Sequence, residues 1–260
     1  MEQFEIKERY TVEDFVLLMR RLRAPGGCPW DAEQTHESLR NNVIEEACEV
    51  AEAIDNCDDA ALREELGDLL MQVVFHCSME EEKGGFGLDD IADTACKKLV
   101  FRHPHVFGEA EGDALDIWEK AKREEKGHRT TAEAMRAVAK TLPALWRAQK
   151  IQKKAAGAGF VWPDVNSAVD KIAEETEELR NGIANGDVAN IEEELGDLLL
   201  AAVNTAGYFG IDPERALGKA CDKYVGRFEI MEKNAETEGR IFSELSIDEM
   251  ISYYKQAKKV

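Results

Sequence analysis

The 260-residue chain is 44% hydrophobic and 33% charged and contains only six prolines, a composition that suits one or two domains of amphipathic helices and argues against disorder. Its formal net charge of −20 disfavours non-specific binding to nucleic acid or to an anionic membrane. The amino terminus lacks the pattern of a signal peptide and no apolar run is long enough to span a bilayer, so we expect a cytoplasmic protein.

The first predicted element that bears on function is a helical hairpin. Apolar side chains recur every three to four residues at Val43, Ala47, Val50, Ala51 and Ile54, which predicts an amphipathic helix. Turn-forming residues at 55–58 separate it from a second helix, and the two helices should therefore be antiparallel. Each helix carries two acidic residues on one face, and the four are Glu46, Glu49, Glu65 and Asp68.

This hairpin should gather its four carboxylates in one volume. Glu49 and Glu65 lie eight residues on either side of Cys57, so they occupy matching heights in the hairpin. Carboxylates this close repel one another unless cations neutralise them. Because an all-oxygen set of ligands prefers hard divalent cations, we expect a site for magnesium, manganese or calcium.

Residues 123–140 are predicted to link two domains. They are polar, and Gly127 interrupts any helix there. The segment from Thr130 to Glu133 has the pattern of a capping box that opens a new helix. A further helix should start near Pro143, because proline is tolerated in a first turn.

The second half of the chain repeats the acidic hairpin. Each carboxylate recurs 129 residues later, at Glu175, Glu178, Glu194 and Asp197. Basic and aromatic residues follow both hairpins at matching spacings: Lys98, Arg102, Trp118 and Lys122 in the first half, and Lys223, Arg227, Tyr254 and Lys258 in the second. An aromatic residue four positions before a lysine suits base stacking beside a phosphate or ribose contact. We therefore predict an all-α protein of two tandem domains, residues 1–122 and 141–260.

Six cysteines show no CxxC pair and no zinc-site spacing. We expect reduced thiols, most of them packed as small buried side chains.

Further segments are similar to landmarks of one protein family. GCPWDAEQT, RHPHVF, LPALWRAQKIQKKA and GFVWPDV accompany the EExxE and EELGDLL segments of the hairpins. In this combination the chain resembles the two-domain MazG family of nucleoside triphosphate pyrophosphohydrolases over nearly its whole length. The resemblance implies all-α domains packed as bundles in a homodimer. It also implies magnesium-dependent hydrolysis of nucleoside triphosphates at the α-phosphorus, which yields a monophosphate and pyrophosphate.

The resemblance also implies residue roles in the second half. Glu175, Glu178, Glu194 and Asp197 would hold metal, and the nucleotide would be bound by Lys171, Asn190, Lys223, Arg227, Tyr254 and Lys258. Glu174 or Glu193 could orient or deprotonate the attacking water, or could have a structural role. Asn42 occupies the position of Lys171 in the first half, so we expect the second half to be the main catalytic one. The first-half site could bind metal and nucleotide, act weakly, or support assembly.

Two other functions remain open at this point. The acidic hairpins could form a non-catalytic module that binds metal or a protein partner. A di-iron carboxylate oxidoreductase also gathers acidic residues in a helical bundle, but it normally needs an ExxH motif that neither hairpin has.

Overall fold

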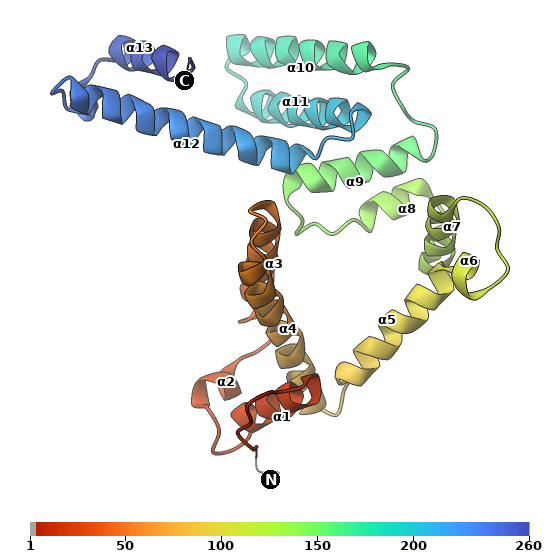
Figure 1. Cartoon of the computed structure of the whole chain (residues 1–260). Helices are drawn as coiled ribbons and strands as arrows, with labels where there is room; N and C mark the ends of the chain where they lie inside the picture. The colour runs from red at the N-terminus through yellow and green to blue at the C-terminus, as the bar shows by residue number, and fades with distance from the viewer. Residues whose placement is uncertain (1–3, 260) are drawn as a thin grey trace. The chain divides into compact units, whose positions relative to one another are not determined.

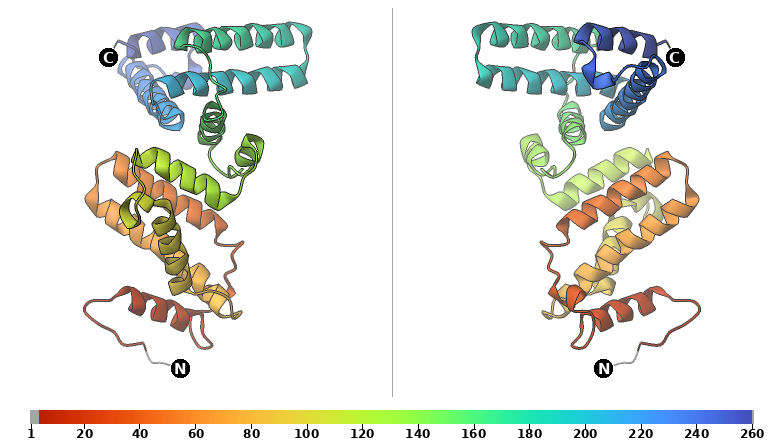
Figure 2. Two further views of the ribbon diagram at one scale, coloured as in Figure 1. Left: turned by 90° about the vertical axis from the view of Figure 1, so that its right-hand side faces the viewer. Right: turned by 90° about the vertical axis from the view of Figure 1, so that its left-hand side faces the viewer.

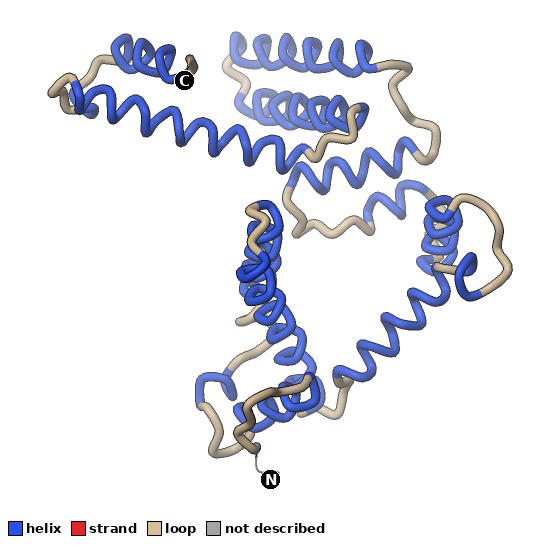
Figure 3. Tube along the Cα trace, in the orientation of Figure 1, coloured by secondary structure: helices blue, strands red, loops and turns tan. Residues whose placement is uncertain are grey.

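The structure is a computed structural model that describes residues 4–259. Within that range every regular element is a helix (Figure 3), which confirms the predicted all-α class. The chain divides into two compact units after Lys126, inside the segment predicted to be a linker. Each unit contains one long antiparallel hairpin.

The hairpin of the first unit is formed by α3 (Arg40–Asp55) and α4 (Asp59–Glu81), which pack along one another. Asp58 caps α4 by accepting hydrogen bonds from two backbone N–H groups of its first turn. The other helices of this unit are α1 (Val12–Arg23), α2 (Pro29–Glu33), α5 (Leu88–Arg102), α6 (Pro104–Phe107) and α7 (Ala114–Lys126).

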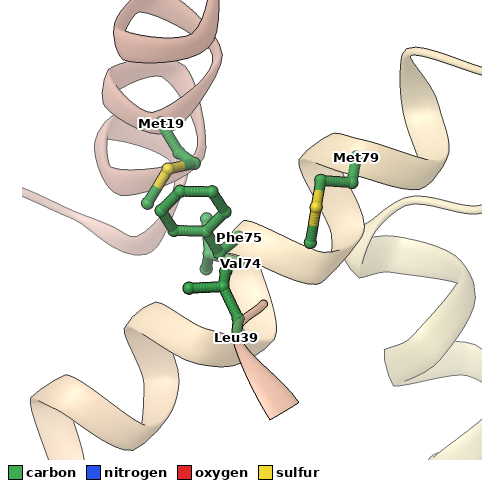
Figure 4. Close-up of a cluster of buried hydrophobic side chains, with 5 residues drawn as sticks. All are labelled: Met19, Leu39, Val74, Phe75 and Met79. Atoms are coloured by element: carbon green, nitrogen blue, oxygen red, sulfur yellow. The ribbon is translucent and has the colours of Figure 1, made fainter. Parts of the chain in front are cut away.

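A small apolar core fixes one end of α4 in the first unit. Figure 4 shows Met19 of α1 and Leu39, the residue before α3, against Val74, Phe75 and Met79 of α4. All five are buried. The core therefore anchors the carboxyl-terminal part of α4, and the acidic residues lie nearer the turn of the hairpin.

The hairpin of the second unit is formed by α10 (Val165–Asn185) and α11 (Val188–Tyr208), which lie side by side in Figures 1 and 2. A separate apolar cluster joins α12 (Pro213–Thr237) to α13 (Ile247–Ala257) and includes Met231, Leu245 and Tyr253. The remaining elements are α8 (Thr131–Arg136), α9 (Ala144–Ala156) and a short 3-10 helix at Phe242–Glu244.

The helix starts predicted between the two units are close to those observed. Thr130 caps α8, with its side chain accepting from the Glu133 backbone N–H at 3.1 Å. The Glu133 carboxylate bonds the backbone N–H of Arg129 at 2.8 Å, one residue before the position a capping box uses. Pro143 is the residue just before α9 and does not lie in its first turn.

The expectation that most cysteines are buried is wrong. Only Cys77 is buried and Cys28 is partly buried, whereas Cys48, Cys57, Cys96 and Cys221 are exposed. The general preference of free cysteine for protein interiors does not say which face of a helix a given cysteine occupies.

The turns of the two hairpins differ in one backbone feature. Cys57 has φ of 55°, and the matching residue in the second hairpin, Gly186, has φ of 67°. Glycine adopts this left-handed conformation without steric cost, whereas a residue with a Cβ is strained there. The first hairpin is therefore closed by a strained residue.

We expect Cys57→Gly to stabilise the first unit by roughly 1 kcal/mol, because it removes the Cβ strain at that position. The free energy of unfolding from urea titration is the measurement. The reciprocal variant Gly186→Cys should destabilise the second unit by a similar amount. Equal stability of Cys57→Gly and wild type would show that the turn bears no strain.

Candidate metal and nucleotide site

The second hairpin brings three of its four predicted ligands together. Glu175 and Glu178 extend from α10 and Glu194 from α11, and one oxygen from each lies within 4.8 Å of the others. Glu175 is buried, with 4% of its surface exposed. Asp197 lies one turn after Glu194 on α11, outside this group of three, and is exposed. The cluster thus has a buried side and an open side.

Burial and mutual repulsion act on these carboxylates. The pKa of Glu178 is raised by partial burial, by its hydrogen bond to Glu175 and by the charge of Glu194. A shared proton lowers the repulsion in such a group, and a bound cation would do the same. The cluster therefore has the charge and the donor atoms that suit a hard divalent cation.

Lys171 supplies a positive charge to the cluster. Its Nζ lies 2.6 Å from oxygens of both Glu174 and Glu175, and these two carboxylates raise the pKa of the lysine. Glu174 is therefore paired with Lys171, whereas Glu193, the other candidate base, is an exposed residue on α11.

Asn190 is placed by the structure beside a carboxylate of the cluster. Its Nδ2 donates to Glu194 Oε1 at 2.7 Å, which orients that carboxylate. Gly182 on α10 faces it, and a Cβ built at Gly182 would lie 2.6 Å from Asn190 Oδ1. The absence of a side chain at Gly182 thus makes room for Asn190.

The predicted nucleotide-binding residues form a second group on α12 and at α13. The Cζ atom of Arg227 is 5.8 Å from the ring centroid of Tyr254, and Lys258 Nζ is 5.0 Å from it. Lys223 lies one turn before Arg227 and is exposed. A half-buried ring with two cations beside it suits stacking with a base and contact with phosphates.

Helix α9 contacts the elements that carry both groups. Trp146 Nε1 donates to both oxygens of Asp212, the residue that caps α12, at 2.9 and 3.0 Å. Gln152 Nε2 donates to the backbone oxygen of Leu200 in α11 at 2.7 Å. The hairpin and the aromatic group are therefore both tied to α9.

The first hairpin holds a similar acidic cluster. One oxygen each of Glu46, Glu49 and Glu65 lies within 4.8 Å of the others, and Asp68 follows on the same face of α4. The pKa of Glu46 is raised by burial and by the charges of Asp68 and Glu49. The pKa of Glu65 is raised by burial and by Glu49.

The first unit also repeats the aromatic group. Arg102 Cζ is 5.4 Å from the ring centroid of Trp118, and Lys122 Nζ is 4.2 Å from it. Arg102 Nε also donates to a Glu125 oxygen at 2.6 Å, so this guanidinium already has an ion-pair partner within the first unit. Lys98, one turn earlier on α5, is exposed.

Further polar residues, not predicted from the sequence to belong to a site, continue along α4. Gln72 lies one turn after Asp68, and His76 and Glu80 follow at four-residue intervals. His36 Nδ1 lies 2.7 Å from His76 Nδ1, and His36 Nε2 lies 2.6 Å from Glu80 Oε1. These residues follow Asp68 at intervals of four, and this spacing could have predicted from the sequence that they share one face of the helix.

This histidine pair predicts a pH-dependent stability of the first unit. The pKa of His76 is lowered by burial and by His36, so the folded state favours the neutral ring. As the pH falls below the ordinary value of 6.5, the unfolded chain binds more protons than the folded one, and stability is lost. If both rings were charged, two N–H groups would face each other across the Nδ1 contact.

Thermal unfolding followed from about pH 7.5 to about pH 5.5 should show this loss, and His76→Asn should reduce it. His128→Asn, which lies outside the cluster, is the matched control and should keep the wild-type slope. An unchanged slope in His76→Asn would contradict the assignment.

One protein-family model matches two separate segments of the chain, in agreement with the internal repeat of the acidic hairpin. A model of the MazG nucleotide pyrophosphohydrolase domain matches residues 34–107 and 164–230, which include both acidic clusters. The chain is 43% identical over 246 residues to the Thermotoga maritima nucleoside triphosphate pyrophosphohydrolase/pyrophosphatase MazG, covering 95% of each protein. It is 40% identical over 257 residues to the Escherichia coli K12 nucleoside triphosphate pyrophosphohydrolase, covering 95% of this chain and 97% of that protein. It is also 41% identical to the uncharacterized Bacillus subtilis protein YabN, covering 94% of this chain and 51% of that protein.

The fold and the sites define a class of all-helical proteins in which two acidic helices form a hairpin suited to a divalent cation. Within that class, the chain belongs to the MazG nucleotide pyrophosphohydrolase family. The resemblance stated from the sequence is thereby confirmed. The matched segments end at residues 107 and 230, so they do not include the aromatic residues Trp118 and Tyr254. Among residues 4–259, none of the helices combines the length and the apolar character needed to cross a bilayer.

Proposed function

We propose that the chain hydrolyses nucleoside triphosphates to monophosphates and pyrophosphate, with magnesium held by the second hairpin. The observation that supports this most directly is the group of Glu175, Glu178 and Glu194, whose oxygens lie within 4.8 Å of one another. The names of the Thermotoga maritima and Escherichia coli relatives support the same reaction.

The residues present fit a magnesium ion. The group consists only of carboxylates, which are the ligands that magnesium and manganese prefer. Burial and the neighbouring carboxylates Glu175 and Glu194 raise the pKa of Glu178, and a bound cation would relieve the repulsion among these groups. Glu175, Glu178 and Glu194 would hold the ion, and Asp197, one turn further along α11, is the fourth candidate ligand.

The chemistry follows from the charges around this group. Magnesium, when bound, supplies Lewis acidity and lowers the pKa of water. Lys171 already lies beside Glu175 and can transfer its contact to a phosphate oxygen. Glu193 is the candidate for accepting the proton of the attacking water, since Glu174 is engaged with Lys171. Water attack at the α-phosphorus breaks the bond to the bridging oxygen, and pyrophosphate leaves with that oxygen.

The aromatic group is proposed to bind the rest of the nucleotide. Tyr254 would stack on the base, and Arg227, Lys258 and Lys223 would neutralise the phosphates. Asn190 is proposed to contribute to substrate binding indirectly, because its hydrogen bond orients Glu194.

The test is a panel of deoxy- and ribonucleoside triphosphates incubated with magnesium and separated by ion-exchange chromatography. We expect monophosphate and pyrophosphate in equal amounts. Hydrolysis in ¹⁸O-labelled water should place the label in the monophosphate, which locates the attack at the α-phosphorus. Diphosphate and inorganic phosphate as products, or activity that survives chelation of all divalent metal, would refute the proposal.

A homodimer is proposed as the functional assembly. Leu195 and Leu199 lie one turn apart on α11 and are 48% and 49% exposed, which leaves an apolar stripe on the hairpin. Such a stripe is normally covered by other helices of a bundle. We place the activity in the cytoplasm, where nucleoside triphosphates are made, without nucleic acid or membrane partners, in keeping with the net charge of −20.

A further inference from the structure

A second tyrosine lies beside the nucleotide-binding group proposed for the second unit. Tyr224 follows Lys223 on α12, and its ring centroid lies 6.0 Å from that of Tyr254 on α13, with the two ring planes at 51°. Tyr224 and Arg227 are three positions apart, so they share one face of α12. The ring of Tyr254 therefore has Tyr224 on one flank and Arg227, whose Cζ is 5.8 Å from the ring centroid, on the other.

The two tyrosines differ in how far they are covered by the protein. Tyr254 is partly buried and packs against the apolar cluster of α12 and α13, whereas 57% of Tyr224 is exposed. Covering an aromatic ring is favourable because it removes a large apolar area from water. The open ring of Tyr224 is therefore a surface on which a planar ligand would gain binding energy.

The position of Tyr224 also distinguishes the two halves of the chain. The basic residues that follow each hairpin align the halves, and Leu99 occupies the position of Tyr224 in the first half. Leu99 is exposed to a similar extent, at 51%. Leucine offers apolar contact but no aromatic face on which a base can stack. The half that contains Lys171 is thus also the half with two neighbouring tyrosine rings.

Two inclined rings favour a large base over a small one. Every base has a π-face and can stack on an aromatic side chain, so a single ring discriminates little. A second ring, inclined to the first, can contact the edge of the same base in the edge-to-face arrangement that aromatic groups favour. A bicyclic purine is large enough to contact both rings, whereas a monocyclic pyrimidine that stacks on one ring leaves more of the other exposed. The purine therefore covers more apolar area.

We infer that Tyr224 is a further nucleotide-binding residue, whose ring contacts the base together with Tyr254 and gives the second half a preference for purine over pyrimidine triphosphates. The inference rests on the proposed function, because it assigns the base subsite of the same nucleotide site. The preference comes from stacking and size, so adenine and guanine nucleotides should both be accepted.

Isothermal titration calorimetry of the full-length protein tests this inference. The ligands are magnesium complexes of triphosphates with a methylene group between the α- and β-phosphates, which bind without being cleaved there, and the base is adenine or cytosine. Wild type should bind the adenine analogue more tightly. Tyr224→Leu, which introduces the residue of the first half, should weaken adenine binding about fivefold and cytosine binding less than about twofold.

Two variants serve as controls for Tyr224→Leu. Tyr224→Phe keeps the ring and should retain the wild-type preference for adenine. Val225→Ala changes the next residue of α12, which is 56% exposed and lies on a different face of the helix, and should leave both affinities unchanged. Far-UV circular dichroism establishes that each variant is folded. Equal weakening of both analogues by Tyr224→Leu, no weakening, or loss of the preference in Tyr224→Phe would overturn the inference.

The binding result is separate from the proposed hydrolysis. Loss of the adenine preference in Tyr224→Leu supports the inference even where ordinary triphosphates are not cleaved, which would refute the proposed function alone. Conversely, normal release of pyrophosphate together with an unchanged base preference in Tyr224→Leu would overturn the inference alone.

Discussion

Glu178→Gln is expected to lower the rate of pyrophosphate release by at least about 100-fold at fixed magnesium. Mutating a residue that only hydrogen-bonds to a metal ligand typically costs about 10- to 100-fold, and replacing a direct ligand such as Glu178 should cost at least as much. The glutamine has nearly the same shape, so the loss comes from removing an anionic oxygen from the group of three. Initial rates with a saturating triphosphate, measured by a pyrophosphate-coupled assay, test this.

Glu49→Gln makes the same change at the matching position of the first hairpin. Its loss of rate should be much smaller, because the second hairpin has the lysine that the first lacks. A large loss in Glu49→Gln with normal turnover in Glu178→Gln would move the chemistry to the first half. Equal losses would mean that both halves contribute.

Gly182→Ala should weaken metal-dependent activity about tenfold, although alanine is the better helix former. The added Cβ would lie 2.6 Å from Asn190 Oδ1, so Asn190 must rotate and release Glu194. The magnesium concentration that gives half-maximal activity should rise accordingly. That concentration, measured from a magnesium titration of the rate, is the readout.

The double-mutant cycle with Asn190→Ala identifies the route of this effect. If Gly182→Ala acts by displacing Asn190, it should add little once Asn190 is already alanine. The double variant has the alanines found at the matching positions of the first hairpin, Ala53 and Ala61, and should fold. Additive losses would show that Gly182 affects the site by another route.

The sequence alone was sufficient to predict the two helical hairpins and the approximate helix starts between them, because these depend on local patterns. The apolar spacing after Val43 and the equal distances of Glu49 and Glu65 from Cys57 indicated the hairpin before any coordinates. The carboxylate clusters followed from the same spacing. The cap at Thr130 is also local, and it too was found from the sequence.

Contacts between helices could not be predicted in the same way. Asn190 and Glu194 are four residues apart on one helix, so their hydrogen bond is local. The space for the Asn190 side chain, however, depends on Gly182 on the other helix of the hairpin. The meeting of His36 with His76 joins residues that are 40 positions apart in the sequence. The burial of Gln72 depends on packing around α4, which no periodicity gives. Exposure of four cysteines was missed for the same reason.

Helix α9 links α11 and α12 within the second unit. Trp146 bonds Asp212 at the start of α12 and Gln152 bonds the backbone oxygen of Leu200 in α11, so α9 is held to both helices. A shift of α11 relative to α12 would break at least one of these hydrogen bonds, each of which contributes about 1 kcal/mol. Loss of either bond should therefore loosen the alignment of the acidic hairpin with α12.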